Sequence, residues 1–316
     1  MILNGISFGP VWGAAGVLNF DGRGYWYHKY LKLFGLNFKG MTHASKTSTW
    51  LRQPGNMPLK DDGMTPKEWK PSCIYVDHIR RIALNAIDLS GFGLEFYLKS
   101  GIWENLDRAF WISFMAIGKT REARMAEYQN CAAALKNYRA RLSLFGLQVN
   151  ISCFNTGLKL EVLLLEVADA LQILSTLGVP LQVKINALTP IEIAIEIARD
   201  PNCHSLCVSN AIPYGSYFEP GWWKKNFGSV SPLQRFRGGA LSGAPLRDLT
   251  CRWIYSARKR GLSKPINGGG GILKPTDVDH FHNNGADSIF LGSIAFLRPT
   301  RVAATIARGY KLYGDD

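Results

Sequence analysis

The sequence predicts an α/β fold: a single (β/α)8 TIM barrel over residues 1–316, with short strands at the N-terminus and an inserted loop region around residues 211–237. From about residue 74, short apolar segments alternate with helix-like segments, a pattern typical of parallel βαβ units. About seven or eight such units fit in the chain, which favours a closed barrel over an open sheet. We therefore expect one domain, with the loops after the strands gathered at one face.

The N-terminal part of the chain does not follow this alternation. Residues 1–30 are rich in glycine and aromatic residues, so we expect short strands and turns that close one end of the domain. Residues 34–42 predict a strand that ends in the polar loop 45–49. The prolines and glycines of residues 52–72 predict a loop, because apolar structure resumes directly on both sides of it.

The alternating part supplies the remaining elements of the barrel. Residues 77–89 are ambiguous, with 82–84 as one candidate strand, and residues 91–103 are mixed. The expected strands are 109–117, 144–152, 181–185, 205–209, 265–267 and 288–291. The expected helices are 120–142, 158–177, 189–198, 246–260, 274–284 and 300–311. A glycine-rich turn is expected at 238–246, before one of these helices.

The composition limits the class of protein. Apolar residues make up 47% of the chain and charged residues 19%, which excludes a disordered chain. The net charge of +13 favours anionic partners such as phosphate cofactors, carboxylate substrates, nucleic acid or an anionic membrane surface. A solvated basic surface would give the same excess of charge, so the charge alone selects no partner.

The cysteines and the apolar segments bear on localisation. Six cysteines are spread along the chain and no secretory leader is recognisable, so we expect reduced thiols and a cytoplasmic protein. No segment reaches the ~18 apolar residues of a membrane-spanning helix. Cys203 and Cys207 lack a second pair of ligands, so we expect no metal site there.

Residues 149–157 are the stretch in which we expect the chemistry. A strand leads into this stretch and a helix follows it, which is where a barrel keeps its functional loops. The amides of Asn150 and Asn155 can bond a planar heterocycle, and the thiol of Cys153 can move a proton if its pKa is tuned. An ordinary strand-to-helix turn explains the same residues equally well.

Two later loops indicate a phosphate site. Residues 265–272 run from a strand into four glycines, and residues 290–293 form a second turn of small residues. Such turns after the last two strands of a barrel are a known phosphate site, because glycine lets backbone N–H groups approach an anion. Lys184 lies in a strand that looks buried, where it needs an anion or must reach solvent, and Lys46 could also reach the centre.

Taken in order along nearly the whole chain, these loops resemble those of the dihydroorotate dehydrogenase family. The N-terminal motifs are Pro10-Val11-Trp12-Gly13-Ala14-Ala15-Gly16-Val17, Ser45-Lys46-Thr47, Gln53-Pro54-Gly55-Asn56 and Asn85-Ala86-Ile87. The central motifs are Asn150-Ile151-Ser152-Cys153-Phe154-Asn155-Thr156, Lys184 and Ser209-Asn210. The C-terminal motifs are Gly239-Ala240-Leu241-Ser242-Gly243, Gly269-Gly270-Gly271-Ile272, Gly285-Ala286-Asp287 and Gly292-Ser293.

The resemblance implies an FMN-dependent oxidoreductase that converts dihydroorotate to orotate in pyrimidine biosynthesis. It implies that Cys153 is the base that takes the C5 proton while a hydride leaves C6 for the flavin. The positions implied for the substrate are Lys46, Asn85, Asn150, Asn155 and Asn210. The positions implied for FMN are Lys46, Asn150, Lys184, Gly243, Gly270, Gly271, Gly292 and Ser293, of which the last five match the phosphate cradle.

The resemblance leaves the electron acceptor open. A cysteine at the base position is similar to the soluble class of the family, whereas residues 241–246 look more like the membrane-associated class. Fumarate, NAD reached through a partner subunit, and a quinone therefore all stay candidate acceptors. We expect a homodimer and no nucleic-acid partner.

The sequence also departs from the family pattern at four positions near the expected site: Asp88, Gly91, Phe154 and Ala211. Polar groups that would pair the substrate are missing there, and Asp88 adds a charge. Three alternatives stay open, because of these departures and, for RNA, because of the net charge of +13. They are a flavin barrel acting on another dihydropyrimidine, one acting on uracil in RNA, and a flavin-binding homologue without this activity.

Overall fold

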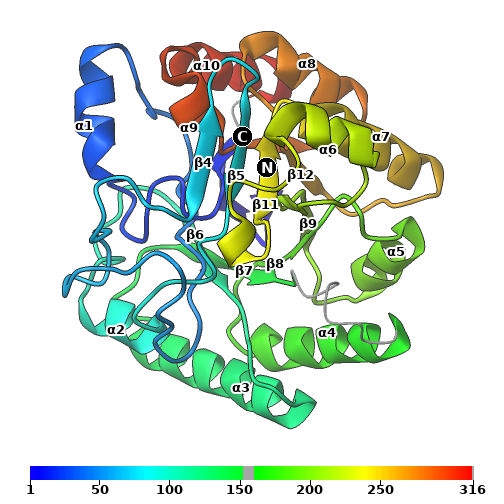
Figure 1. The fold of residues 1–316 in the computed structure, drawn as a ribbon. Coiled ribbons are helices and arrows are strands. Elements are labelled where there is room, and N and C mark those ends of the chain that lie inside the picture. The colour runs from blue at the N-terminus through cyan, green and yellow to red at the C-terminus, as the bar shows by residue number, and fades with distance from the viewer. Residues whose placement is uncertain (152–159, 315–316) are drawn as a thin grey trace.

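The computed structural model shows an α/β barrel (Figure 1). It describes residues 1–151 and 160–314, and for residues 160–163 it describes the backbone alone. Among these residues, seven strands form one parallel sheet. Their order is β3 (Val11–Gly13), β13 (Ser288–Leu291), β12 (Ile266–Gly269), β9 (Ser205–Val208), β8 (Leu181–Ile185), β7 (Phe145–Asn150) and β6 (Phe110–Phe114). β8 and β13 coincide with the predicted strands residue for residue.

Residues 42–48 close the sheet into a barrel, because they pair with the strands at both of its edges. Thr42 forms a parallel bridge with Trp12 of β3, and its N–H donates to the carbonyl of Val11 at 2.9 Å. On the other side, Ser48 bridges Phe114 of β6. The predicted barrel is therefore confirmed.

The strand predicted at residues 34–42 is wrong. This region instead follows helix α1 (Trp26–Leu33), and Gly35 and Gly40 both adopt positive φ, which interrupts an extended chain. The pairing with the barrel begins only at Thr42. Helix α1 itself lies in the stretch for which only short strands and turns were predicted.

Helices surround the strands in a ring (Figure 1). The ring contains α2 (Leu94–Lys99), α3 (Arg121–Tyr138), α4 (Leu160–Ser175), α5 (Ile191–Arg199), α7 (Leu246–Lys259), α8 (Pro275–Asn283), α9 (Ile294–Leu297) and α10 (Val302–Tyr313). Apart from α2 and the short α9, these agree with the predicted helices to within a few residues. Helix α3 begins after Thr120, whose hydroxyl accepts a hydrogen bond from the backbone N–H of Ala123 at 3.2 Å, as a good N-cap does.

A second, antiparallel sheet is drawn across the centre of the barrel in Figure 1. Its order is β10 (Ile212–Pro213), β11 (Ala240–Gly243), β5 (Ile82–Asn85) and β4 (Ile74–Asp77). The glycine-rich turn predicted at residues 238–246 is therefore wrong in part, because β11 occupies its middle and pairs with β5. The inserted region predicted at 211–237 contains β10, α6 (Pro220–Phe227) and the short helix η2 (Gln234–Phe236).

Buried apolar side chains of the described residues form a small cluster inside the barrel and a larger one between the strands and the helices. The small cluster includes Leu3 and Phe8, and Phe8 stacks on Trp111 of β6 with ring centroids 4.3 Å apart. Leu3 belongs to the hairpin of β1 (Ile2–Leu3) and β2 (Ile6–Ser7). As expected, the N-terminal strands close one end of the domain.

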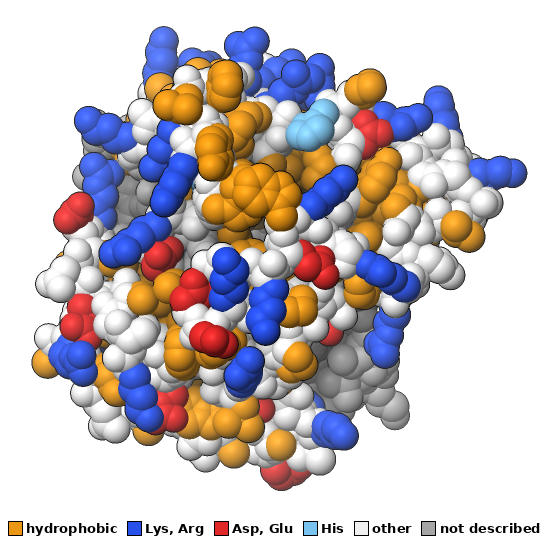
Figure 2. All heavy atoms as spheres, turned by 60° about the vertical axis from the view of Figure 1, so that its left-hand side comes forward, with side chains coloured by type: hydrophobic (Ala, Val, Ile, Leu, Met, Phe, Trp, Pro, Cys, Tyr) orange, Lys and Arg blue, Asp and Glu red, His pale blue; other side chains and the backbone are white. Residues whose placement is uncertain are grey.

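The surface shows how the basic residues are distributed and where apolar side chains are exposed. Figure 2 shows Lys and Arg side chains dispersed over one face, among acidic and apolar side chains, so the excess of basic charge does not form one continuous patch there. Exposed apolar residues include Tyr30 and Leu33 of α1 and Trp69, whose ring stacks on that of Trp26. None of the described helices is long and apolar enough to cross a membrane.

Candidate functional site

A cavity of about 420 Å³ lies where the barrel strands end. Its walls are residues at or just after the carboxyl ends of the strands, together with Asn85 of β5 and Ser242 and Gly243 of β11. Parallel barrels keep their chemistry at this face, and the volume is in the range of ~300–1,000 Å³ that suits a cofactor or small ligand. The antiparallel sheet therefore supplies one wall of the cavity.

The structure brings the predicted site residues together. Every one that lies in the described part of the chain lines the cavity, namely Lys46, Asn85, Asn150, Lys184, Asn210, Gly243, Gly270, Gly271, Gly292 and Ser293. Cys153 and Asn155, and also Phe154, lie outside the described residues. Of the other departures from the family pattern, Asp88 and Ala211 line the cavity, whereas Gly91 does not and lies close to the Phe20 ring.

Lys46 is buried beside the cavity, with 7% of its surface exposed. Its ammonium donates a hydrogen bond to the carbonyl of Ser90 and lies 5.0 Å from the centre of the Phe20 ring. Burial lowers the pKa of Lys46 to about 7, because removal from water disfavours the charged form, although Cys73 opposes the shift. An anion in the cavity would stabilise the charged form.

Lys184 projects from β8 into the same cavity and is equally buried. Burial lowers its pKa as well, opposed by Cys207. Among the side chains described, those of residues 1–151 and 164–314, no acidic group pairs with Lys184 or with Lys46. A buried ammonium without an acid is costly, so both lysines favour a ligand that carries negative charge.

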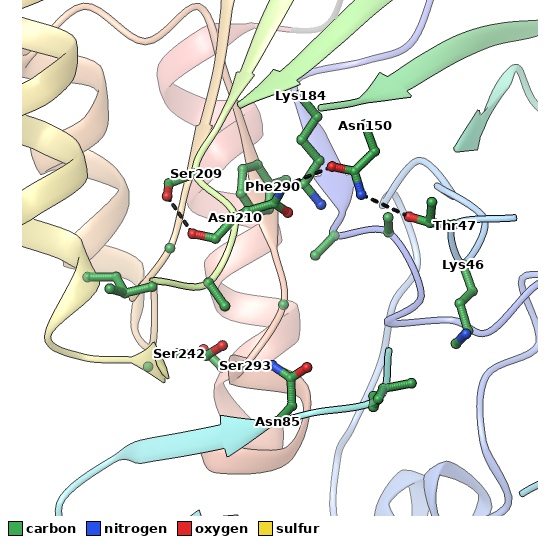
Figure 3. A pocket seen from close by; sticks show the side chains of 18 of the residues that line it. Lys46, Thr47, Asn85, Asn150, Lys184, Ser209, Asn210, Ser242, Phe290 and Ser293 are labelled. Carbon is green, nitrogen blue, oxygen red and sulfur yellow. Dashed lines mark hydrogen bonds between the residues drawn. The ribbon is translucent and has the colours of Figure 1, made fainter. Parts of the chain in front are cut away.

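The amides near Lys184 form a short hydrogen-bonded series (Figure 3). Asn210 Nδ2 donates to Asn150 Oδ1 at 2.9 Å, and Asn150 Nδ2 donates to Thr47 Oγ1 at 3.4 Å. Figure 3 shows Asn85, Ser242 and Ser293 on the side of the cavity opposite Asn150. A planar ring between these two sides would meet amide donors and acceptors along its edges.

The loop after β5 is held in an unusual conformation. Asp88 and Leu89 both have φ of 55°, and Gly55 packs so closely beneath them that an added Cβ would lie 2.6 Å from the carbonyl oxygen of Asp88. Asn56 Nδ2 donates to the carbonyl of Ala86 at 2.8 Å. The motif at residues 53–56 thus braces the loop that carries Asp88 to the margin of the cavity.

The glycines that line the cavity fit a phosphate group. Gly243 has φ of +104°, and an added Cβ would lie 2.3 Å from the carbonyl oxygen of Arg81. At Gly271, with φ of +81°, an added Cβ would lie 2.5 Å from the backbone nitrogen of Arg247. Backbone that no side chain covers lets N–H groups approach an anion. This part of the cavity wall is therefore closely packed backbone without side chains, which fits an anionic group such as a phosphate.

Thr47 and Ser242 also line the cavity, although neither was predicted as a site residue. Thr47 lies in the predicted polar loop, but its role in orienting Asn150 depends on a contact between segments 103 residues apart. Ser242 lies on β11, whose half-buried and buried residues alternate. That alternation was the available signal, and it is informative only once residues 240–243 are assigned as a strand.

Comparison with known proteins agrees with this geometry. The family described as dihydroorotate dehydrogenase matches residues 26–311. The catalytic subunit of dihydroorotate dehydrogenase B (NAD(+)) from Pelobacter propionicus is 26% identical over 233 residues, 72% of this chain and 70% of that protein. Dihydroorotate dehydrogenase A (fumarate) from Lactiplantibacillus plantarum is 33% identical over 76 residues, 24% of this chain and 25% of that protein.

A solved structure supports the fold over almost the whole chain. The crystal structure of the dihydroorotate dehydrogenase of Eimeria tenella in complex with ferulenol superposes with a TM-score of 0.65 at 18% identity. The superposition covers 98% of this chain and 82% of that one. Because the family matches most of the sequence and the predicted site residues gather at one cavity, the chain belongs to the dihydroorotate dehydrogenase family of flavoprotein oxidoreductases, which act on CH–CH donors.

Proposed function

We propose that this protein oxidises dihydroorotate to orotate with FMN as its cofactor, in the biosynthesis of pyrimidines. The observation that carries the proposal is the cavity itself, in which buried Lys46 and Lys184, a group of amides and a glycine cradle lie together. This combination suits a phosphorylated cofactor and an anionic planar substrate.

The glycine-lined part of the cavity would hold the FMN phosphate through backbone N–H groups. The residues proposed for this cradle are Gly243, Gly270, Gly271, Gly292 and Ser293. Lys184, whose ammonium is buried, would place positive charge beside the ring, and Lys46 and Asn150 would also contact it. The chemistry that FMN supplies when bound is the acceptance of a hydride equivalent.

The substrate would lie between side chains from opposite sides of the cavity. We propose that Lys46, Asn85, Asn150, Asn155 and Asn210 bind the carboxylate and the polar edges of the ring. Cys153 would remove the C5 proton of dihydroorotate as a general base while the hydride leaves C6. The proposals for Cys153 and Asn155 rest on the family resemblance, since both lie outside the described residues.

An anaerobic titration of the purified protein tests the proposal. Dihydroorotate should bleach the absorbance of the bound flavin, whereas dihydrouracil and dihydrothymine should not. Cys153→Ser should retain flavin and be reduced at least about 100-fold more slowly at neutral pH. A flavin that stays oxidised in excess dihydroorotate would contradict the substrate assignment.

A second candidate is oxidation of another dihydropyrimidine, and Asp88 is the observation that favours it. Asp88 is one of the residues that line the cavity, where its negative charge would repel the carboxylate of dihydroorotate and tolerate a neutral ring. The same titration separates the candidates, because reduction by dihydrouracil or dihydrothymine alone would select the second.

The electron acceptor is proposed from the relatives, whose names include both NAD(+) and fumarate. We propose that one of these two, and not a quinone, reoxidises the flavin. Stopped-flow reoxidation of the dihydroorotate-reduced protein by fumarate, by NAD(+) together with a partner subunit, and by a soluble quinone tests this. Rapid reoxidation by the quinone alone would overturn the proposal.

A further inference from the structure

A row of polar side chains crosses the inside of the barrel below the cavity. Ser113, Gln148, Gln182 and Ser205 lie on β6, β7, β8 and β9, which are neighbours in the sheet. The strand register pairs Ser113 with Gln148, Gln148 with Gln182, and Gln182 with Ser205. All four are at most 3% exposed. The register therefore places them in one buried row.

Each member of the row donates a hydrogen bond to the next. Ser113 Oγ donates to Gln148 Oε1 at 3.2 Å, and Gln148 Nε2 donates to Gln182 Oε1 at 2.8 Å. Gln182 Nε2 then donates to Ser205 Oγ at 3.1 Å. Buried amides must be satisfied in this way, because an unpaired amide inside a protein costs about as much as a lost hydrogen bond.

Thr47 joins this row to the cavity. Its hydroxyl lies 2.9 Å from Ser113 Oγ, and it accepts a hydrogen bond from Asn150 Nδ2. Because the Ser113 proton is directed to Gln148, the Thr47 proton must be directed to Ser113. The series from Asn210 through Asn150, Thr47 and the row thus runs in a single direction, which we call the amide chain.

Such a chain can fix the orientation of an amide. The oxygen and nitrogen ends of an Asn side chain have nearly the same shape, so packing alone does not distinguish them. If the oxygen and nitrogen of the Asn150 amide exchanged places, Thr47 would have to donate its proton to Asn150 and Ser113 would have to donate to Thr47. Gln148 Oε1 would then lose its donor. Hydrogen bonds in series also strengthen one another.

We propose that Ser113, Gln148 and Gln182 are positioning residues, which set the direction of the Asn150 amide and so the pattern of donors and acceptors that the cavity offers to a ring. None of the three lines the cavity. The link to orotate rests on the proposed function, whereas the orientation of Asn150 does not.

Substitutions at Gln148 test the proposal. Gln148→Met keeps the size of the side chain and breaks the chain, because Ser113 then has no acceptor below it. Gln148→Glu should preserve it, because a buried, protonated carboxyl group accepts from Ser113 and donates to Gln182. Asn267→Leu is the matched control: Asn267 is also a buried amide of the barrel, but its partners are Ser288 and Cys207, which lie outside the amide chain.

The first readout does not depend on the function. The side-chain N–H signals of Asn150, assigned with Asn150→Asp, should shift and exchange with solvent faster in Gln148→Met. They should stay near their wild-type positions in Gln148→Glu and Asn267→Leu. If Gln148→Met does not fold, Ser113→Ala breaks the chain one step earlier. Unchanged Asn150 signals in both breaking variants would overturn the proposal.

The second readout is orotate affinity, followed by the absorbance of the bound flavin. Gln148→Met should weaken orotate binding by roughly 5- to 100-fold and Gln148→Glu should restore most of it. Equal weakening by Asn267→Leu would show a general loss of structure and overturn the role in positioning. A wild-type protein that binds no orotate would contradict the proposed function, while the Asn150 signals would still decide the proposal on the amide chain.

Discussion

Among single residues, the buried ammonium of Lys46 makes the stability of the folded protein depend on pH. Its pKa is about 7 in the folded protein and 10.5 is its ordinary value. Between these values the unfolded chain binds more protons than the folded one, so the Lys46 contribution makes folding more favourable as pH rises through this window. Below pH 7, Lys46 is charged in both the folded and the unfolded protein, so the free-energy cost of burying it no longer changes with pH.

We therefore predict that Lys46→Met is more stable than the wild type at pH 6 and that this advantage shrinks by pH 9. The measurement is urea unfolding of the ligand-free protein at a series of pH values. Lys39→Met, which removes an exposed lysine, serves as the control and should follow the wild-type profile. An identical pH response in Lys46→Met and the wild type would contradict the cost assigned to the buried ammonium.

Asp88 gives a second prediction at this scale. Its carboxylate is exposed at the margin of the cavity, so its repulsion of an anionic substrate is weakened by solvent. Asp88→Asn should tighten dihydroorotate binding by about two- to fivefold. The effect should diminish at high salt, and Asp61→Asn, away from the cavity, should show none. Weaker binding by Asp88→Asn would mean that the carboxylate assists the ligand.

Some site residues could be predicted because their residue types are uncommon within or directly after an apolar strand. Lys184 stands in an apolar strand and the glycines at 268–271 follow another, so each predicts a ligand without knowledge of the fold. Thr47 and Gln148 could not be predicted in this way. Their importance depends on the strand register, which brings Gln148 beside Gln182 and Ser113.

At the scale of elements, strand β11 links the second sheet to the glycine cradle. It pairs with β5 along its whole length, and its last residue, Gly243, packs against the backbone at Arg81. A side chain at this position would push β11 away from β5 or cover the backbone that faces the cavity. The conformation of Gly243 is therefore tied to the shape of the wall.

We predict that Gly243→Ala destabilises the protein by about 1–3 kcal/mol or more and abolishes retention of FMN. Gly215→Ala is the matched control, because Gly215 also has positive φ of +81° but has open space around it. Thermal unfolding and the flavin-to-protein absorbance ratio measure the two effects. Equal flavin content in both variants would argue against a phosphate site at Gly243.

The errors in element prediction have a common physical cause. Residues 238–243 contain three glycines, which predict a turn locally, but long-range pairing of residues 240–243 with residues 82–85 makes them a strand. The stretch 42–48 has too few regular pairs to be a named strand, yet its bridges close the barrel. Strands such as β8 were predicted correctly because apolar residues alternate with Gln182 and Lys184 at the two-residue period of a strand.

At the scale of the whole molecule, the interior of the barrel is a core in its own right. Phe8 is 1% exposed, contacts Trp12 as well as Trp111, and belongs to a segment that forms no part of the cavity. Its loss should therefore affect stability and leave the geometry of the site unchanged. The alternation of strands and helices predicted the barrel, but it contained no information on how the interior is filled.

We predict that Phe8→Ala lowers the free energy of unfolding by about 3–5 kcal/mol. Flavin reduction by dihydroorotate should keep its wild-type rate at temperatures where the variant is folded. Leu33→Ala, which removes a side chain 82% exposed on α1, should change stability by less than about 0.5 kcal/mol. Denaturant titration and stopped-flow reduction provide the two measurements. A small change in Phe8→Ala would show that the interior can rearrange around the gap.

The pairing of β3 with β13 constrains when the protein can become functional. Residues 11–13 lie beside residues 289–291, and the cavity takes Ala14 from one end of the chain and Ser293 from the other. A nascent chain cannot close the ring until residue 291 has left the ribosome, although its helices can form earlier. Unfinished chains therefore expose an open sheet edge and have no complete cavity, so a cofactor cannot assist their folding before synthesis has passed that point.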